Sequence, residues 1–169
     1  EFRRVLFRSC RLLSSSCTPL SLDALREGLA GRHRLPDRPV AVTFDDGYRS
    51  VLTDALPILE RYAIPATVFV TVDPIVRGEH FWFDSVARRD GEAAVADARA
   101  ASAETWTNLV RSARQPSRRE QAHRPLMSEE LTALAAHPLI EIGAHTRSHP
   151  TLARLSRSEE HTSELQSRL

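Results

Sequence analysis

The sequence predicts an α/β fold with parallel strands. Three short runs, at 40–44, 66–72 and 139–145, consist mainly of β-branched and other apolar residues, as buried parallel strands do. Apolar residues at helical spacing lie between the first run and the second. The order strand, helix, strand favours a parallel unit with a right-handed crossover. The 169 residues are enough for one core.

The segment 21–30 is expected to be a short amphipathic helix before the first strand. Its leucines recur at i, i+3 and i+7, which places them on one face. Ser21 can cap the start of the helix, and Gly31 can end it.

The second predicted helix follows the strand at 40–44. Pro57 would break a helix interior, so the helix is expected to begin near Thr53 or Asp54. Pro57 then falls in the first turn, where its missing N–H has no partner to lose.

Residues 73–125 are expected to form a helical insertion. Residues 84–113 are rich in Ala and Arg and are predicted to be helical, and another helix is predicted from Ser128. The aromatic run FWFD at 81–84 allows two interpretations. It could be a platform for a sugar, or a hydrophobic plug for the insertion, which we favour.

Composition narrows the range of partners. The net charge is +1, and no basic stripe with interleaved aromatic residues occurs, so we expect no nucleic-acid partner. No apolar run approaches the roughly 20 residues of a membrane span. Cys10 and Cys17 could form a small disulfide loop, but we favour two incidental free thiols.

Both termini carry segments that we expect to be foreign to the domain. Residues 157–167, RSEEHTSELQS, match the translation of a common sequencing-adapter DNA, and VLFRS at 5–9 matches its reverse complement. We therefore expect 1–9 and 157–169 to be adapter-derived tails and 10–156 to be the domain. The alternative for the end of the chain is an ordinary polar tail.

Titratable clusters follow two of the three predicted strands. Asp45, Asp46 and Gly47 follow the first strand, and His145 and His149 follow the third. In parallel α/β folds, sites form beyond the carboxyl ends of the strands. Two imidazoles and one carboxylate would leave a fourth position open on a metal ion, as in catalytic zinc sites.

Other interpretations of these clusters remain open. An Asp-Asp pair alone is often a solvated turn, and two histidines four residues apart are often ordinary surface or core residues. A receiver-type domain would use clustered acids to hold magnesium, but it has no use for His145 and His149. The two clusters together, each at a strand end, are more specific than either alone.

Four segments resemble the polysaccharide deacetylase family, also known as NodB-homology or carbohydrate esterase family 4 enzymes. TFDDG and HTRSHP resemble its first two motifs, while PILERYAIPATVFV and MSEELTALAAHPLIEIGAHTRSHPTLARLS resemble the flanking stretches; they lie at 43–47, 145–150, 57–70 and 127–156. The resemblance implies a distorted, incomplete (β/α) barrel, of which this chain would be the N-terminal part. It also suggests a location in the cell envelope or outside the cytoplasm.

The resemblance also implies a reaction. Family members hydrolyse acetyl groups from N-acetylated or O-acetylated carbohydrate. Asp45 would be the general base, and Asp46, His145 and His149 would hold a divalent metal, which we expect to be zinc. The family's oxyanion and general-acid motifs have no match after residue 150, so we expect this chain by itself to be inactive. The alternative is an inert carbohydrate-binding module on the same fold.

Overall fold

The computed structural model describes residues 1–113 and 123–151, which fall into two compact units. Unit 1 comprises residues 1–70 and 128–143. Unit 2 comprises 71–127 and the chain from 144 onward. The expected tail at 157–169 lies outside the described residues.

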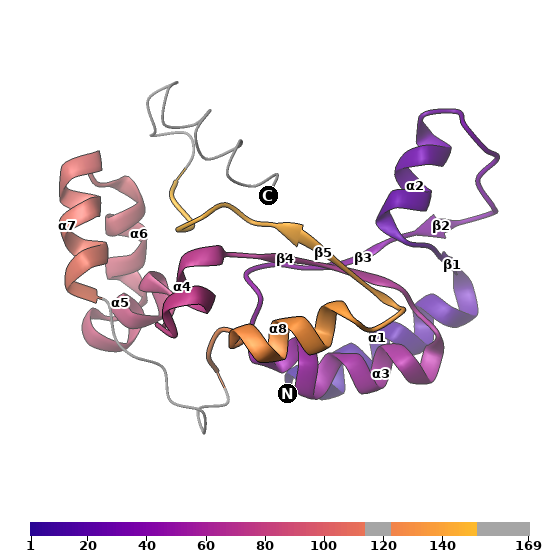
Figure 1. Cartoon of the computed structure of the whole chain (residues 1–169), viewed down its shortest axis with the longest axis horizontal. Coiled ribbons are helices and arrows are strands. Elements are labelled where there is room, and N and C mark those ends of the chain that lie inside the picture. Colours follow the sequence, from indigo (N-terminus) through magenta and orange to yellow (C-terminus); the bar gives the residue numbers. More distant parts are fainter. Residues whose placement is uncertain (114–122, 152–169) are drawn as a thin grey trace. The chain divides into compact units, whose positions relative to one another are not determined.

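Unit 1 contains a three-stranded sheet in the order β3-β4-β5, with β4 in the middle (Figure 1). The strands are β3 (Val42–Phe44), β4 (Ala66–Val70) and β5 (Ile140–Ala144). β3 and β4 pair in parallel, with Val42 opposite Ala66. The three predicted strands are therefore confirmed, although each is shorter than predicted. β3 begins two residues late, β4 ends two residues early, and β5 lacks one residue at each end.

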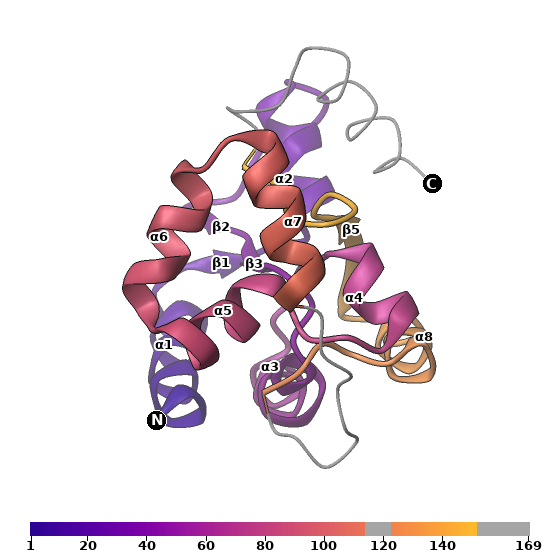
Figure 2. The same cartoon turned by 90° about the vertical axis from the view of Figure 1, so that its left-hand side faces the viewer.

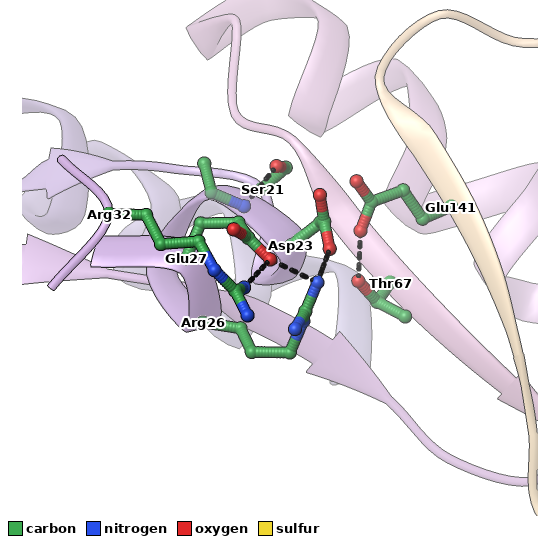
Figure 3. Close-up of polar contacts among 8 residues, drawn as sticks. Ser21, Asp23, Arg26, Glu27, Arg32, Thr67 and Glu141 are labelled. Carbon is green, nitrogen blue, oxygen red and sulfur yellow. Dashed lines mark hydrogen bonds and ion pairs between the residues drawn. The ribbon is translucent and has the colours of Figure 1, made fainter. Parts of the chain in front are cut away.

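The pairing of β4 with β5 is supported by side chains as well as the backbone. The Ala66 amide donates to the Leu139 carbonyl at 2.8 Å. The Thr67 hydroxyl donates to the Glu141 carboxylate at 2.9 Å, as Figure 3 shows. Thr67 is buried, so this bond gives a partner to a hydroxyl group in a nearly dry position.

A second, two-stranded sheet in unit 1 was not predicted. β1 (Thr18–Pro19) pairs in parallel with β2 (Pro39–Val40). The apolar run at 40–44 is thus divided between two sheets, because Ala41 belongs to neither β2 nor β3.

The helices of unit 1 are those expected, with two additions. They are α1 (Phe2–Ser16), α2 (Leu22–Leu29), the π-helix η1 (Val51–Ala55), α3 (Leu56–Tyr62) and α8 (Ser128–Ala135). α1, α3 and α8 lie on the same side of the three-stranded sheet (Figure 1). The additions are α1 and η1.

α1 covers most of the segment that we expected to be a foreign tail. The ring of Phe7 packs edge-on against Tyr62 of α3, with centroids 5.6 Å apart, and the Arg61 guanidinium lies over the Phe7 ring. Cys10 is buried and Cys17 is half-buried, and both are free thiols, as expected.

The predicted caps of unit 1 are largely confirmed. The Ser21 hydroxyl accepts a hydrogen bond from the Ala24 amide at 3.1 Å and caps α2. Figure 3 shows this cap beside the ion pairs of Arg26 and Arg32. Pro57 lies in the first turn of α3, as expected. The predicted start near Thr53 or Asp54 is wrong, because the π-helix η1 occupies 51–55 and α3 begins only at Leu56.

Unit 2 contains helices between residues 72 and 113, as expected for 84–113. They are α4 (Val72–Arg77), α5 (Trp82–Asp90), α6 (Glu92–Ala100) and α7 (Ala103–Ala113). Figure 2 shows α6 and α7 side by side, and the two helices are in contact. Gly91, at φ 88°, makes the sharp turn from α5 to α6.

The FWFD run supplies the core of unit 2, in line with the plug interpretation. Phe81 is fully buried, and Trp82 is buried among Val86, Val95 and Ala98. Across residues 1–113 and 123–151, every helix is too short or too polar to cross a membrane.

Candidate active site

The acidic motif forms a tight turn immediately after β3 in unit 1. Asp46 has φ 71° and Gly47 has φ 86°. The Gly47 amide donates to the Asp45 carbonyl at 2.9 Å and closes the turn. Asp and Gly adopt this left-handed region more easily than most residues, so the sequence suits the conformation.

The two carboxylates of this turn differ in environment. Asp45 is exposed, whereas Asp46 is half-buried and its Oδ1 atom is shielded from solvent. Two adjacent acids with different surroundings can perform different tasks.

The histidine motif forms a compact loop in unit 2. His145 is the first residue after β5. The rings of His145 and His149 lie 4.9 Å apart between centroids, tilted by 54°. The His149 amide donates to the Thr146 hydroxyl at 3.0 Å, which folds the loop back on itself. The two imidazoles are thus brought together within one unit.

The histidine loop contains backbone strain. Thr146 has φ 65° and His149 has φ 56°. A β-branched residue such as threonine rarely adopts this region, and each such residue costs on the order of 1–3 kcal/mol. Conformations of this kind persist only where surrounding contacts hold them, and they concentrate at functional sites.

Contacts from the start of α4 hold the first half of the loop. The Thr71 hydroxyl donates to the His145 carbonyl at 3.3 Å. The amides of Val72 and Asp73 donate to the carbonyls of Thr146 and Arg147, at 3.4 and 2.8 Å. The backbone of the loop is therefore fixed from His145 to Arg147.

Contacts from α5 hold the second half. The Trp82 indole N–H donates to the His149 carbonyl at 3.1 Å. The ring of Phe83 packs against the His149 imidazole, with centroids 5.1 Å apart. Sequence reasoning selected this aromatic run only as a plug or a sugar platform. Its contact with the histidine loop depends on tertiary structure.

Comparison with known proteins identifies the family. The family model for polysaccharide deacetylase matches residues 32–168. The chain belongs to the polysaccharide deacetylase family. The match includes both motifs, and it also runs across part of the expected tail, whose origin stays a prediction.

A relative of this deacetylase-family chain is also a deacetylase by name. It is 44% identical over 48 residues to the poly-β-1,6-N-acetyl-D-glucosamine N-deacetylase of Escherichia coli K12, an alignment that covers 28% of the chain and 7% of the relative.

Two solved structures confirm the expected fold class. The Streptococcus pyogenes deacetylase PplD in complex with acetate matches with TM-score 0.62 and 16% identity, over 98% of this chain and 54% of that one. IcaB from Ammonifex degensii matches with TM-score 0.62 and 20% identity, over 98% of this chain and 58% of that one. The deacetylase-family chain thus spans little more than half of each of these structures.

Proposed function

We propose that this chain is part of a metal-dependent hydrolase that removes acetyl groups from N-acetylated or O-acetylated carbohydrate. One observation carries the proposal. The Asp-Asp-Gly turn and the histidine loop each begin at the residue after a strand of the same sheet, β3 and β5, in a chain of the polysaccharide deacetylase family. Carboxyl ends of parallel strands are where α/β enzymes place their sites.

The donor set suits a divalent transition metal, and we propose that Asp46, His145 and His149 hold it. All three are half-buried. The two imidazoles already share one loop, and the shielded Oδ1 of Asp46 is a carboxylate oxygen in a place where a cation would offset its burial. Imidazole with carboxylate is a common zinc combination, although other transition metals accept it too.

Asp45 is proposed to act as the general base. A divalent ion in the site would polarise the acetyl carbonyl and lower the pKa of the attacking water. Asp45 is exposed and sits beside Asp46 in the chain, so it can take the proton of that water.

An N-acetylglucosamine polymer is the substrate to test first. The Escherichia coli relative is named for the β-1,6-linked polymer, and the 48 aligned residues are 44% identical. The alignment is too short to extend that relative's substrate to this chain without a measurement.

Two variants test the proposal. Turnover is measured on the chain joined to its natural downstream sequence, which the family resemblance predicts to supply the general acid. Asp45→Asn should keep the metal and lose about 10²- to 10⁴-fold in rate, because the amide preserves shape but accepts no proton. His149→Ala should lose the metal, measured by elemental analysis after dialysis.

The outcomes separate the alternatives. Undiminished metal content in His149→Ala would remove it from the ligand set, and near-normal turnover by Asp45→Asn would remove Asp45 as base. Binding of the polymer without any turnover, with metal bound, would favour the inert carbohydrate-binding module.

A further inference from the structure

Two consecutive aromatic residues at the start of α5 contact the same histidine by different means. The Trp82 indole N–H donates to the His149 carbonyl at 3.1 Å. The Phe83 ring lies against the His149 imidazole, with centroids 5.1 Å apart and planes tilted by 58°. One contact fixes the backbone of His149, and the other fixes its side chain.

Trp82 is itself rigidly placed. It is 5% exposed and packs with Val86, Val95 and Ala98 in the core of unit 2. Its ring meets Trp106 edge-on, with centroids 6.1 Å apart. A buried indole N–H needs an acceptor, and here the acceptor is the His149 carbonyl. The hydrogen bond therefore joins the packed core to the strained end of the histidine loop.

Phe83 has an equally firm support. Its ring stacks on that of Phe81, with centroids 5.2 Å apart and planes within 4° of parallel. Phe81 is fully buried, so Phe83 has little freedom to turn away from His149. Contacts of this kind are what keep a residue at φ 56° in place.

We propose that Trp82 and Phe83 are positioning residues that hold His149 in its ligating orientation. The helical segment that begins with α5 would then support the metal site as well as fill its own core. The inference rests on the proposed function in one respect, the role of His149 as a ligand. The orientation of His149 can be tested without any metal.

The chain offers a matched control for Trp82. Trp106 belongs to the same cluster, and its buried indole N–H finds no hydrogen-bond acceptor in the part of the chain that the structure describes. Trp82→Phe and Trp106→Phe therefore remove the same atoms from the same core. Only the first removes a hydrogen bond to the histidine loop.

The first measurement is Zn²⁺ affinity of the full chain, by competition with a chromophoric chelator. Residues that orient a metal ligand typically change affinity 10- to 100-fold when lost. We expect Trp82→Phe to weaken Zn²⁺ binding about tenfold and Trp106→Phe to leave it within about twofold. Equal weakening in both variants would overturn the positioning role of Trp82, because it would reflect core packing alone.

The second measurement uses the metal-free chain. A ring 5.1 Å from an imidazole shifts the proton resonances of that imidazole by its ring current. Phe83→Leu should move the His149 Cε1–H and Cδ2–H resonances toward random-coil positions at constant pH. Phe7→Leu, which removes a ring in unit 1, should leave them in place. Unmoved resonances in Phe83→Leu would overturn the role of Phe83.

The two measurements distinguish failure of this inference from failure of the proposed function. If the resonances respond to Phe83→Leu but His149→Ala retains full Zn²⁺ affinity, the contacts hold His149 and the proposed ligand set is wrong. If His149→Ala loses Zn²⁺ while the aromatic variants do not, the ligand set stands and the positioning role is wrong.

Discussion

Asp73 binds Arg147 through both its backbone and its side chain. The Asp73 amide donates to the Arg147 carbonyl at 2.8 Å, and the Arg147 Nε donates to Asp73 Oδ1 at 3.0 Å. The other carboxylate oxygen pairs with Arg77 at 3.3 Å. Arg147 lies between His145 and His149 in the chain, so this pair ties the histidine loop to the start of α4.

Loss of the Asp73 carboxylate should loosen the histidine loop but change the overall free energy of unfolding only slightly. Arg147 is 53% exposed, so we expect Asp73→Asn to cost less than about 1 kcal/mol of unfolding free energy. Amide exchange at residues 145–149 should nevertheless become faster. Asp23→Asn, which breaks an exposed pair with Arg26 on α2, is the control and should leave that exchange unchanged. Identical exchange rates in both variants would show that the pair does not hold the loop.

Thr146 is expected to matter through its hydroxyl. Thr146→Val keeps the shape and the backbone strain but removes the acceptor of the His149 amide. It should lower the free energy of unfolding by about 1 kcal/mol, measured by urea denaturation. Thr146→Ser retains the acceptor and should stay close to the original stability. A Val variant as stable as the Ser variant would contradict the role of this hydrogen bond.

Gly143 is required for space, two residues before His145. A Cβ added there would lie 2.5 Å from Cδ1 of Phe69 on β4, closer than two non-bonded carbon atoms can approach without a shift. Gly143→Ala should therefore cost about 1–3 kcal/mol, by overpacking. In a Phe69→Leu background the same change should cost clearly less, since the clash is removed. If thermal unfolding showed that Gly143→Ala costs the same stability in both backgrounds, a clash with Phe69 would not be the cause.

The two cysteines should differ in reactivity. Burial raises the pKa of the Cys10 thiol above its usual value, whereas Cys17 is only half-buried. At pH 8 a maleimide should therefore label Cys17 well before Cys10, and both equally in guanidinium. Because the folded state binds the Cys10 proton more tightly than the unfolded state does, the free energy of unfolding should fall as the pH rises above the thiol's usual pKa. Rapid labelling of Cys10 at pH 8 would mean that α1 does not pack as described.

Sequence patterns predicted the elements in which local chemistry and packing agree. The cap at Ser21 and the first-turn position of Pro57 depend on backbone hydrogen bonds that local sequence controls, and the structure contains both. The strand at 66–70 is mostly apolar and mostly buried, as a central parallel strand requires. The strand at 140–144 retains Ile140 and Ile142 but includes Glu141, and only Ile140 is buried.

Other elements had no such local signal. The β1–β2 pair has two residues per strand, too few for any periodicity. The π-helix η1 differs from an α-helix by one hydrogen-bond step, which spacing cannot resolve at this length. We set residues 1–9 aside as a tail, so the helix α1 that includes most of them was not expected.

The candidate site also has a part that the sequence predicted and a part that it did not. Residue types and spacing were enough to select Asp45, Asp46, His145 and His149, and their roles remain proposals. The supports of the histidine loop were not predictable. Trp82 and Asp73 are separated from His149 and Arg147 by more than sixty positions in the chain, so only the tertiary structure brings them together.

The connection from β4 to β5 is much longer than that from β3 to β4, and this difference bears on how the protein folds. Closing a chain segment costs entropy that grows with the logarithm of its length, by about 0.6 kcal/mol per doubling. We therefore expect β3 and β4 to pair early and β5 to join late. Pulse-labelling hydrogen exchange would show β4 amides protected before those of β5, and simultaneous protection would contradict this order. A late β5 also means that His145, the first residue beyond it, reaches its place only near the end of folding.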